Sequence, residues 1–352
     1  MMDWKKYVTQ IQLDVTSYCN AKCVACSRND ADNDNNKQPW LPLQHLDIEL
    51  WRKFVKESDG YDLRWLIFNG SWGDAGMHPL LPELIEIWAE THPNAHVEIA
   101  TNGGTHNAEW WKKLGTYSRK YLKNHDVKFA IEGVNNESHS TYRRSTSFDK
   151  IIENAKAFID AGGWATWIMT VFDHNYEEIP QARQMAKDLG FTVFEIRESF
   201  IKHAHVTQNG KTWHVTAKDV PDEIFSGKSL FYGNSSEEFD TDALNNVNKD
   251  NDWKHSKELP SHQCHWYTEG KLQIDPWGNV WPCCHTSDSS INPIEKPEGV
   301  LKYIDEPGFN NLNDHSFEEI LSHPWYVEHL DKIVNRADMR ICQEMCRVKK
   351  II

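Results

Sequence analysis

The stretch Cys19-Asn-Ala-Lys-Cys23-Val-Ala-Cys26 decides the fold, because it directly follows the apolar run Gln10–Val15. Short apolar runs of this kind suit parallel strands that are buried on both faces, and the loop after such a strand lies at the active edge of the sheet. Three thiolates at this spacing can hold one iron–sulfur cubane and leave one iron open to a cofactor. A zinc site would need a fourth ligand close by, and His45 is the nearest candidate.

Further apolar runs continue the pattern along the chain. Amphipathic segments lie between them, and one of these is predicted to begin after a Ser147 cap and to end at Gly162–Gly163. This alternation of six βα units predicts an α/β fold over residues 1–202, either a parallel sheet or a partial (βα)6 TIM-like barrel, with its chemistry at the carboxyl ends of the strands. The remaining predicted strands are Arg64–Phe68, His96–Ala100, Val127–Ile131, Trp164–Val171 and Thr192–Ile196.

The pattern changes after residue 202. Residues 203–260 are predicted to form a hairpin that turns at Asn209–Gly210, followed by a polar linker. Residues 261–352 are predicted to form a small α+β extension. Lys271–Ile274 and Asn279–Trp281 flank a turn there, and Ser316-Phe-Glu-Glu319 has the pattern of a capping box.

Composition excludes several classes of protein. The 352 residues include 52 acidic and 38 basic ones, giving a formal charge of −14, which argues against nucleic-acid or anionic-membrane binding. We see no apolar stretch near the ~20 residues that a membrane span needs, and no signal sequence. The eight cysteines fall in three groups, and without a signal sequence disulfides are not favoured. We therefore expect a protein of the reducing cytoplasm.

Segments after later strands, taken with the cysteine triplet, resemble the radical S-adenosylmethionine (radical SAM) superfamily. The triplet matches the family's Cys-x3-Cys-x2-Cys motif, and Gly73-Asp74-Ala75 resembles its Gly-Glu-Pro region with Asp for Glu and Ala for Pro. Thr101-Asn102-Gly103 resembles the family's Thr-Asn-Gly. Ile131-Glu132-Gly133 with His139-x2-Tyr142-Arg143 resembles its Ile-Asp-Gly and His-x2-Tyr-Arg.

The resemblance implies roles for particular residues. Cys19, Cys23 and Cys26 would ligate a 4Fe–4S cluster that binds and reductively cleaves SAM. The residues implied in SAM binding are Gly73, Asp74, Asn102, Glu132, Arg143 and Arg197, the last of which ends the sixth predicted strand.

A second cysteine group lies in the C-terminal segment. Cys264, Cys283, Cys342 and Cys346 could close either a second 4Fe–4S cluster or a tetrahedral zinc site. The segment resembles the SPASM/twitch extension of radical SAM enzymes, which favours an auxiliary 4Fe–4S cluster. Cys284 would then be the spare thiol, on the opposite face of a strand from Cys283, where it either packs as a small apolar group or donates hydrogen to a substrate radical.

The resemblance further implies a radical SAM oxidoreductase or modifying enzyme. A 5′-deoxyadenosyl radical would abstract a substrate hydrogen, and an oxidation or bond-forming step would follow on a peptide or protein side chain or on a small molecule. The alternatives are an epimerase that uses Cys284 as hydrogen donor, or a non-catalytic electron-transfer iron–sulfur protein. A flavodoxin- or ferredoxin-type protein would supply electrons. Because the triplet begins at position 19, we expect no peptide-recognition domain before it.

Overall fold

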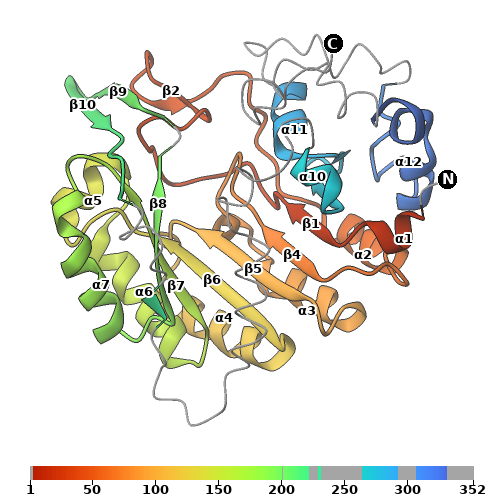
Figure 1. Cartoon of the computed structure of the whole chain (residues 1–352), viewed down its shortest axis with the longest axis horizontal. Helices are drawn as coiled ribbons and strands as arrows, with labels where there is room; N and C mark the ends of the chain where they lie inside the picture. The colour runs from red at the N-terminus through yellow and green to blue at the C-terminus, as the bar shows by residue number, and fades with distance from the viewer. Residues whose placement is uncertain (1–2, 200, 222–228, 231–263, 292–306, 331–352) are drawn as a thin grey trace.

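The computed structural model describes residues 3–199, 201–221, 229–230, 264–291 and 307–330 (Figure 1). Its core is a nine-stranded sheet in the order β11-β8-β7-β6-β5-β4-β1-β12-β13. Strands β8 through β12 in this order run parallel to their neighbours, and the edge strands β11 and β13 are antiparallel. The strands are β1 Gln10–Leu13, β4 Trp65–Phe68, β5 His96–Thr101, β6 Asn124–Ala130, β7 Ala165–Val171, β8 Val193–Glu198, β11 Ser229–Leu230, β12 Lys271–Ile274 and β13 Val280–Trp281.

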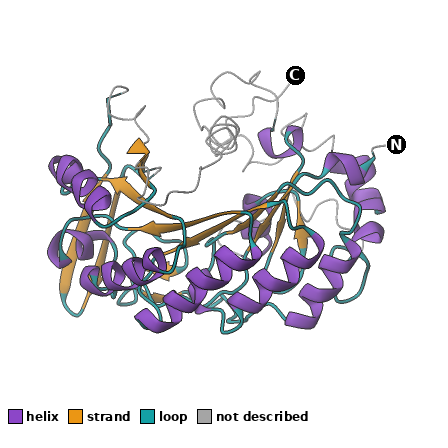
Figure 2. Ribbon diagram, turned by 90° about the horizontal axis from the view of Figure 1, so that it is seen from below, coloured by secondary structure: helices purple, strands orange, loops and turns teal. Residues whose placement is uncertain are grey.

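Helices cover one face of this sheet, the convex one in Figure 2. Among the described helices, none combines the length and apolarity needed to cross a bilayer. The helices and helical turns are α1 Trp4–Tyr7, α2 Ile48–Glu57, η1 Ala75–Met77, α3 Leu81–Thr91, α4 Ala108–Tyr121, α5 Asn136–Tyr142, α6 Phe148–Asp160, η2 Tyr176–Glu178, α7 Ile179–Asp188, α10 His265–Thr268, α11 Cys284–Ile291, α12 Phe317–Ser322 and η5 Trp325–His329.

The six strands predicted for the barrel are confirmed as β1 and β4 to β8, with ends that move by up to three residues. Helix α6 also begins and ends as its sequence indicates. The Ser147 hydroxyl accepts from the Lys150 N–H at 3.5 Å, and Gly162 has a φ of +89° just beyond the last turn. Phe158 on its buried face packs against Phe129 of β6, which fixes the helix on the outside of the sheet.

The C-terminal segment extends the barrel sheet. Strand β12 lies parallel to β1, with Leu272 opposite Ile11. The buried Gln273 donates from Nε2 to Asp14 Oδ2 at 2.9 Å. The predicted capping box at α12 is confirmed, because the Ser316 N–H donates to Glu319 at 2.8 Å.

The hairpin predicted after residue 202 is confirmed as β9 His203–Gln208 and β10 Lys211–Thr216. Asn209 and Gly210 have φ angles of 52° and 72°, the left-handed pair that a tight two-residue turn requires. A smaller ribbon, β2 Asn29–Asp30 with β3 Asn36–Lys37, follows the first cysteine group. Both ribbons lie above the carboxyl ends of the barrel strands in Figure 1.

Candidate active site

The loop after β1 carries the first cysteine group, and Cys19, Cys23 and Cys26 are all free thiols. Cys23 is buried, whereas Cys19 and Cys26 are half-buried. Ala25, between the last two cysteines, has a φ of 68°, which side chains other than glycine rarely adopt. A loop held in this conformation is fixed by its surroundings.

Two backbone hydrogen bonds fix the loop to the segment that follows α5. The N–H of Lys22 donates to Arg144 O at 2.8 Å, and that of Val24 donates to Tyr142 O at 3.0 Å. Val24 is fully buried in a small apolar cluster with residues of the β9–β10 hairpin. The cysteine loop is thus held by backbone hydrogen bonds to the segment after α5 and by apolar packing against the β9–β10 hairpin.

Arg28 is a further anchor that the sequence did not reveal. Its side chain is buried and donates from Nε to Trp72 O at 2.9 Å and from Nη2 to Ser17 O at 3.1 Å. These bonds join the chain after the triplet to the segments that follow β4 and β1. Because Arg28 stands at the start of a polar stretch, its sequence context predicts an exposed side chain and gives no sign of this role.

The electrostatics of the thiols favour a metal partner. Burial raises the pKa of Cys19 and of Cys23 to about 12 and also raises the pKa of Cys26. Repulsion from Cys26 adds to the first two shifts. Because metals bind the thiolate, three thiolates in one loop, one buried and two half-buried, need strong positive charge beside them, and an iron–sulfur cluster supplies it. The donor set therefore fits such a cluster.

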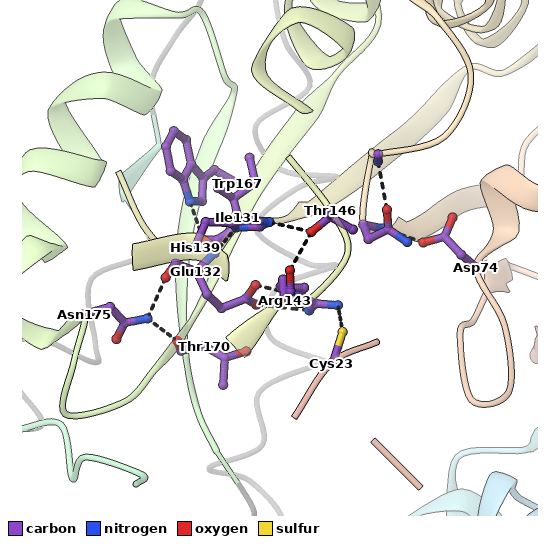
Figure 3. A network of polar contacts seen from close by, with 12 residues as sticks. Cys23, Asp74, Ile131, Glu132, His139, Arg143, Thr146, Trp167, Thr170 and Asn175 are labelled. Carbon is purple, nitrogen blue, oxygen red and sulfur yellow. Dashed lines mark hydrogen bonds and ion pairs between the residues drawn. The ribbon is translucent and has the colours of Figure 1, made fainter. Parts of the chain in front are cut away.

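Arg143 links the cysteine loop to the end of β6, as Figure 3 shows. Its Nη1 lies 3.7 Å from Cys23 Sγ, and its Nε and Nη2 donate to the two oxygens of Glu132 at 2.6 and 3.0 Å. Glu132 is fully buried, and Arg143 is one-fifth exposed. The guanidinium lowers the pKa of Cys23, which partly offsets the effect of burial. The structure thus brings together two of the predicted cofactor residues and a predicted cluster ligand.

The backbone around Glu132 is held by neutral groups. Asn175 donates from Nδ2 to Glu132 O at 3.0 Å, and His139 Nδ1 accepts from the Glu132 N–H at 3.3 Å (Figure 3). The other ring nitrogen of His139 contacts Thr146 Oγ1 at 3.0 Å. Burial lowers the pKa of His139 to about 3, so the ring stays neutral. Its place in the motif is therefore structural.

Asp74 binds the end of β5. Its Oδ2 accepts from the Asn102 N–H at 2.6 Å, and its Oδ1 accepts from Thr101 Oγ1 and the Gly76 N–H, both at 2.9 Å. Asn102 in turn donates from Nδ2 to Asn20 Oδ1 at 2.8 Å, and the same nitrogen lies 3.8 Å from Cys19 Sγ. The Asp74 carboxylate therefore positions the loop that carries Asn102.

Gly73 lies directly against the cysteine loop. A Cβ at this position would be 2.1 Å from Thr16 O and 2.7 Å from Tyr18 O, so only glycine fits. Position 73 therefore requires glycine for steric reasons.

Arg197 lies in a different cluster of charged side chains from Arg143. On β8 its Nε donates to Glu195 at 2.9 Å, and its other charged neighbours are Glu98 and Asp126. These residues lie on the sheet face opposite the helices. The predicted role of Arg197 in SAM binding stays a prediction.

The two described cysteines of the second ligand group are Cys264 and Cys283. Both are buried, just before α10 and α11 respectively, and burial raises the pKa of Cys264. The other two predicted ligands, Cys342 and Cys346, lie outside the described residues.

The predicted strand position of Cys284 is wrong. Strand β13 ends at Trp281, and Cys284 is the first residue of α11. Pro282 has no N–H to continue the ladder, which ends the strand before either cysteine. The alternation of strand faces therefore does not apply to Cys283 and Cys284. Cys284 is half-buried and packs against the main core.

Two family models match the parts of the chain that carry the two cysteine groups. Residues 13–186 match the model of the radical SAM superfamily, and residues 264–347 match the SPASM iron–sulfur cluster-binding domain. One relative is AlbA, the subtilosin biosynthesis protein of Bacillus subtilis, 27% identical over 51% of this chain and 37% of AlbA. Another is the AdoMet-dependent heme synthase of Methanosarcina barkeri, 25% identical over 53% of this chain and 49% of the synthase. The chain thus matches less than half the length of either relative.

Solved structures share the fold. Streptococcus suis SuiB bound to S-adenosylmethionine gives a TM-score of 0.51 at 13% identity, covering 86% of this chain and 67% of SuiB. The enzyme anSMEcpe with bound AdoMet gives 0.54 at 13% identity, covering 91% and 82%. Fold and site together define an α/β-barrel protein with iron–sulfur clusters. The chain belongs to the radical SAM superfamily and carries a SPASM domain, and its cofactors are 4Fe–4S clusters and S-adenosylmethionine.

Proposed function

We propose that this chain cleaves SAM reductively and uses the resulting radical to oxidise, or to form a bond on, a side chain of a peptide or protein. The peptide class is supported by relatives, since SuiB has been solved with the precursor peptide SuiA and anSMEcpe with the Cp18Cys peptide. A small-molecule substrate is the second candidate within the same chemistry.

Each residue has a defined task in this proposal. Cys19, Cys23 and Cys26 hold the cluster, and SAM bound there supplies a 5′-deoxyadenosyl radical on reduction. Asn102 directs an N–H toward one sulfur and Arg143 toward another, and such contacts tune a cluster. Glu132 holds Arg143 in place through two charge-assisted bonds. A flavodoxin- or ferredoxin-type donor in the cytoplasm would provide the electron.

One observation carries the proposal: of the three free thiols in one loop, Cys23 has the guanidinium of Arg143 at 3.7 Å and Cys19 has the amide of Asn102 at 3.8 Å. Arg143 directly follows α5, and Asn102 directly follows β5. A plain electron-transfer protein has no need for an arginine held beside one sulfur of a three-cysteine loop.

SAM cleavage tests this function. Anaerobically reconstituted protein given dithionite and SAM should form 5′-deoxyadenosine and methionine, and Cys23→Ala should abolish the product. Cys284→Ala is the matched cysteine control and should retain cleavage. Unchanged turnover in Cys23→Ala would refute the assignment.

Iron analysis tests the second site. With three plus four ligands the wild type should bind about eight irons per chain, and the triple Cys19/Cys23/Cys26→Ala variant about four. About four irons with one zinc in the wild type would make the C-terminal site structural zinc.

Epimerisation is the alternative outcome. If Cys284 donates hydrogen, Cys284→Ala would keep its clusters and SAM cleavage but make no inverted product. Wild-type product formed in heavy water would then carry one solvent deuterium. We expect neither result, because Cys284 packs against the core.

A further inference from the structure

The two faces of the barrel sheet differ in chemistry. The outer face is apolar, as shown by Phe129 and Trp167, which pack with the aromatic residues Phe158 and Phe191 respectively. The inner face carries charged side chains at alternate positions on β5, β6 and β8. Barrel interiors are usually filled with branched apolar side chains. On these three strands the charged inner-face residues are Glu98, Asp126, Lys128, Glu195 and Arg197.

Four of these side chains form two ion pairs. Lys128 Nζ lies 2.5 Å from Glu98 Oε2, with both side chains about nine-tenths buried at 12% and 10% exposure. Arg197 Nε lies 2.9 Å from Glu195 Oε1, and the Arg197 side chain is half exposed, near the ends of the strands. Solvent therefore reaches this face at the end where the cysteine loop lies.

Asp126 is the fifth charged residue, and its direct partner is a hydroxyl. Both of its carboxylate oxygens lie 2.9 Å from Thr166 Oγ1, which has one hydrogen to donate. Burial raises the pKa of Asp126 to about 7; Lys128 lowers it, and Glu98 and Glu195 raise it further. The group holds three carboxylates and two cations.

Asp126 is half-buried, and a partly desolvated carboxylate without a cation in contact costs free energy that an arriving cation removes. Resting on the proposed function, we propose that this inner-face charge group binds a primary ammonium or guanidinium group of the substrate, with Asp126 as its direct partner. The electrostatics supply the reason, since Glu98 and Glu195 repel the ionised Asp126 carboxylate and an added cation beside it would offset that repulsion.

The bound cation would not be the reacting group. Asp126 lies four residues before Ala130, where β6 ends, about 13 Å at strand rise, and Glu132 lies beyond that end. Glu132 holds the arginine that approaches Cys23. The cationic group therefore anchors the substrate deep on the sheet and leaves the reacting carbon nearer the strand ends.

Calorimetric titration of the cluster-loaded protein with SAM present tests this inference. The probes are N-acetyl-lysine methylamide, its neutral isostere N-acetyl-norleucine methylamide, and N-acetyl-glutamate methylamide. The lysine probe should bind about tenfold tighter than the norleucine probe. Asp126→Asn should bring that ratio close to one, whereas Asp160→Asn, on the exposed surface of α6, should leave it unchanged. Iron content and SAM cleavage of each variant verify that it is folded.

The outcomes separate this inference from the proposed function. Equal binding of lysine and norleucine probes, tighter binding of the glutamate probe, or an unchanged ratio in Asp126→Asn would overturn the cation site, even if SAM is cleaved. A lysine preference in a protein that cannot cleave SAM would keep the site and overturn the function. A parallel titration with n-pentylamine shows whether the bound cation belongs to a peptide or to a small amine. Tighter binding of the lysine probe than of n-pentylamine would assign the cation to a peptide, and equal binding of the two would assign it to a small amine.

Discussion

Asp14 is a buried carboxylate where β1 meets β12, and replacing it with asparagine should stabilise the protein above neutral pH. Its Oδ1 accepts from the Ser71 N–H at 3.0 Å and its Oδ2 accepts from Gln273. Burial raises the pKa of Asp14 from 3.8 to about 7, and Asp275 adds repulsion against the lowering effect of those bonds. In Asp14→Asn the new amide could keep the first bond through its oxygen. Its amino group would replace the oxygen that now accepts from Gln273 Nε2, so the Gln273 amide must turn over, which lets its oxygen, unpartnered within the described chain, accept from that amino group.

The size of the effect follows from the two pKa values. When the pKa of a carboxyl group is higher in the folded protein than in the unfolded chain, ionising that group lowers the free energy of unfolding. The free energy of unfolding therefore falls as pH rises from 3.8 to 7 and then levels off. The full penalty is about 4 kcal/mol. Relative to wild type, the gain in Asp14→Asn should therefore grow by about 2 kcal/mol between pH 5.5 and 8.

Anaerobic denaturant titration of the cluster-loaded protein, followed by tryptophan fluorescence, measures this gain. Asp32→Asn, at an exposed position, is the matched control and should show a difference that does not vary with pH. A pH-independent difference in Asp14→Asn as well would refute the reasoning, since it would mean that Asp14 ionises in the folded protein as it does in the unfolded chain.

Two further substitutions test the packing of the cysteine loop and the C-terminal segment. Gly73→Ala should lose the iron bound at the cysteine triplet and cost about 3 kcal/mol, because its Cβ would overlap Thr16 O; Gly210→Asn, in an open turn, is the control, and normal iron content in Gly73→Ala would contradict the geometry. Ser316→Ala removes the cap of α12 and should cost about 1 kcal/mol in denaturant titration, whereas Ser322→Ala at the helix end should cost little. Equal losses in the two serine variants would show that the cap is not the cause.

The barrel was predictable because each strand has one face packed on helices, which leaves apolar residues at regular positions. Val127 and Phe129 on β6 reveal that face. In the sequence, the intervening Asp126 and Lys128 have the pattern of the solvent-exposed face of a strand. Only the curvature of the folded sheet shows that they lie on its inner face. Cysteine spacing likewise located the cluster loop.

Contacts between distant segments could not be predicted. The pair Glu132–Arg143 lies within one motif, but the approach of Arg143 to Cys23 spans 120 residues. The geometry at Cys284 was missed because a local apolar pattern does not show that Pro282 ends the strand. The first outcome depends on the backbone path between distant segments, whereas the second follows from a residue type, the proline at position 282.

The pairing of β12 with β1 also orders the events of biosynthesis. Residues 10–13 need a partner strand at residues 271–274, so one edge of the first strand stays unpaired until most of the chain has left the ribosome. Unpaired edges are sites of mispairing, and parallel pairing between distant segments forms slowly. The cysteine loop begins directly after this strand, so its surroundings are completed late. Cluster insertion into the nascent protein would therefore follow, rather than guide, the docking of the C-terminal segment.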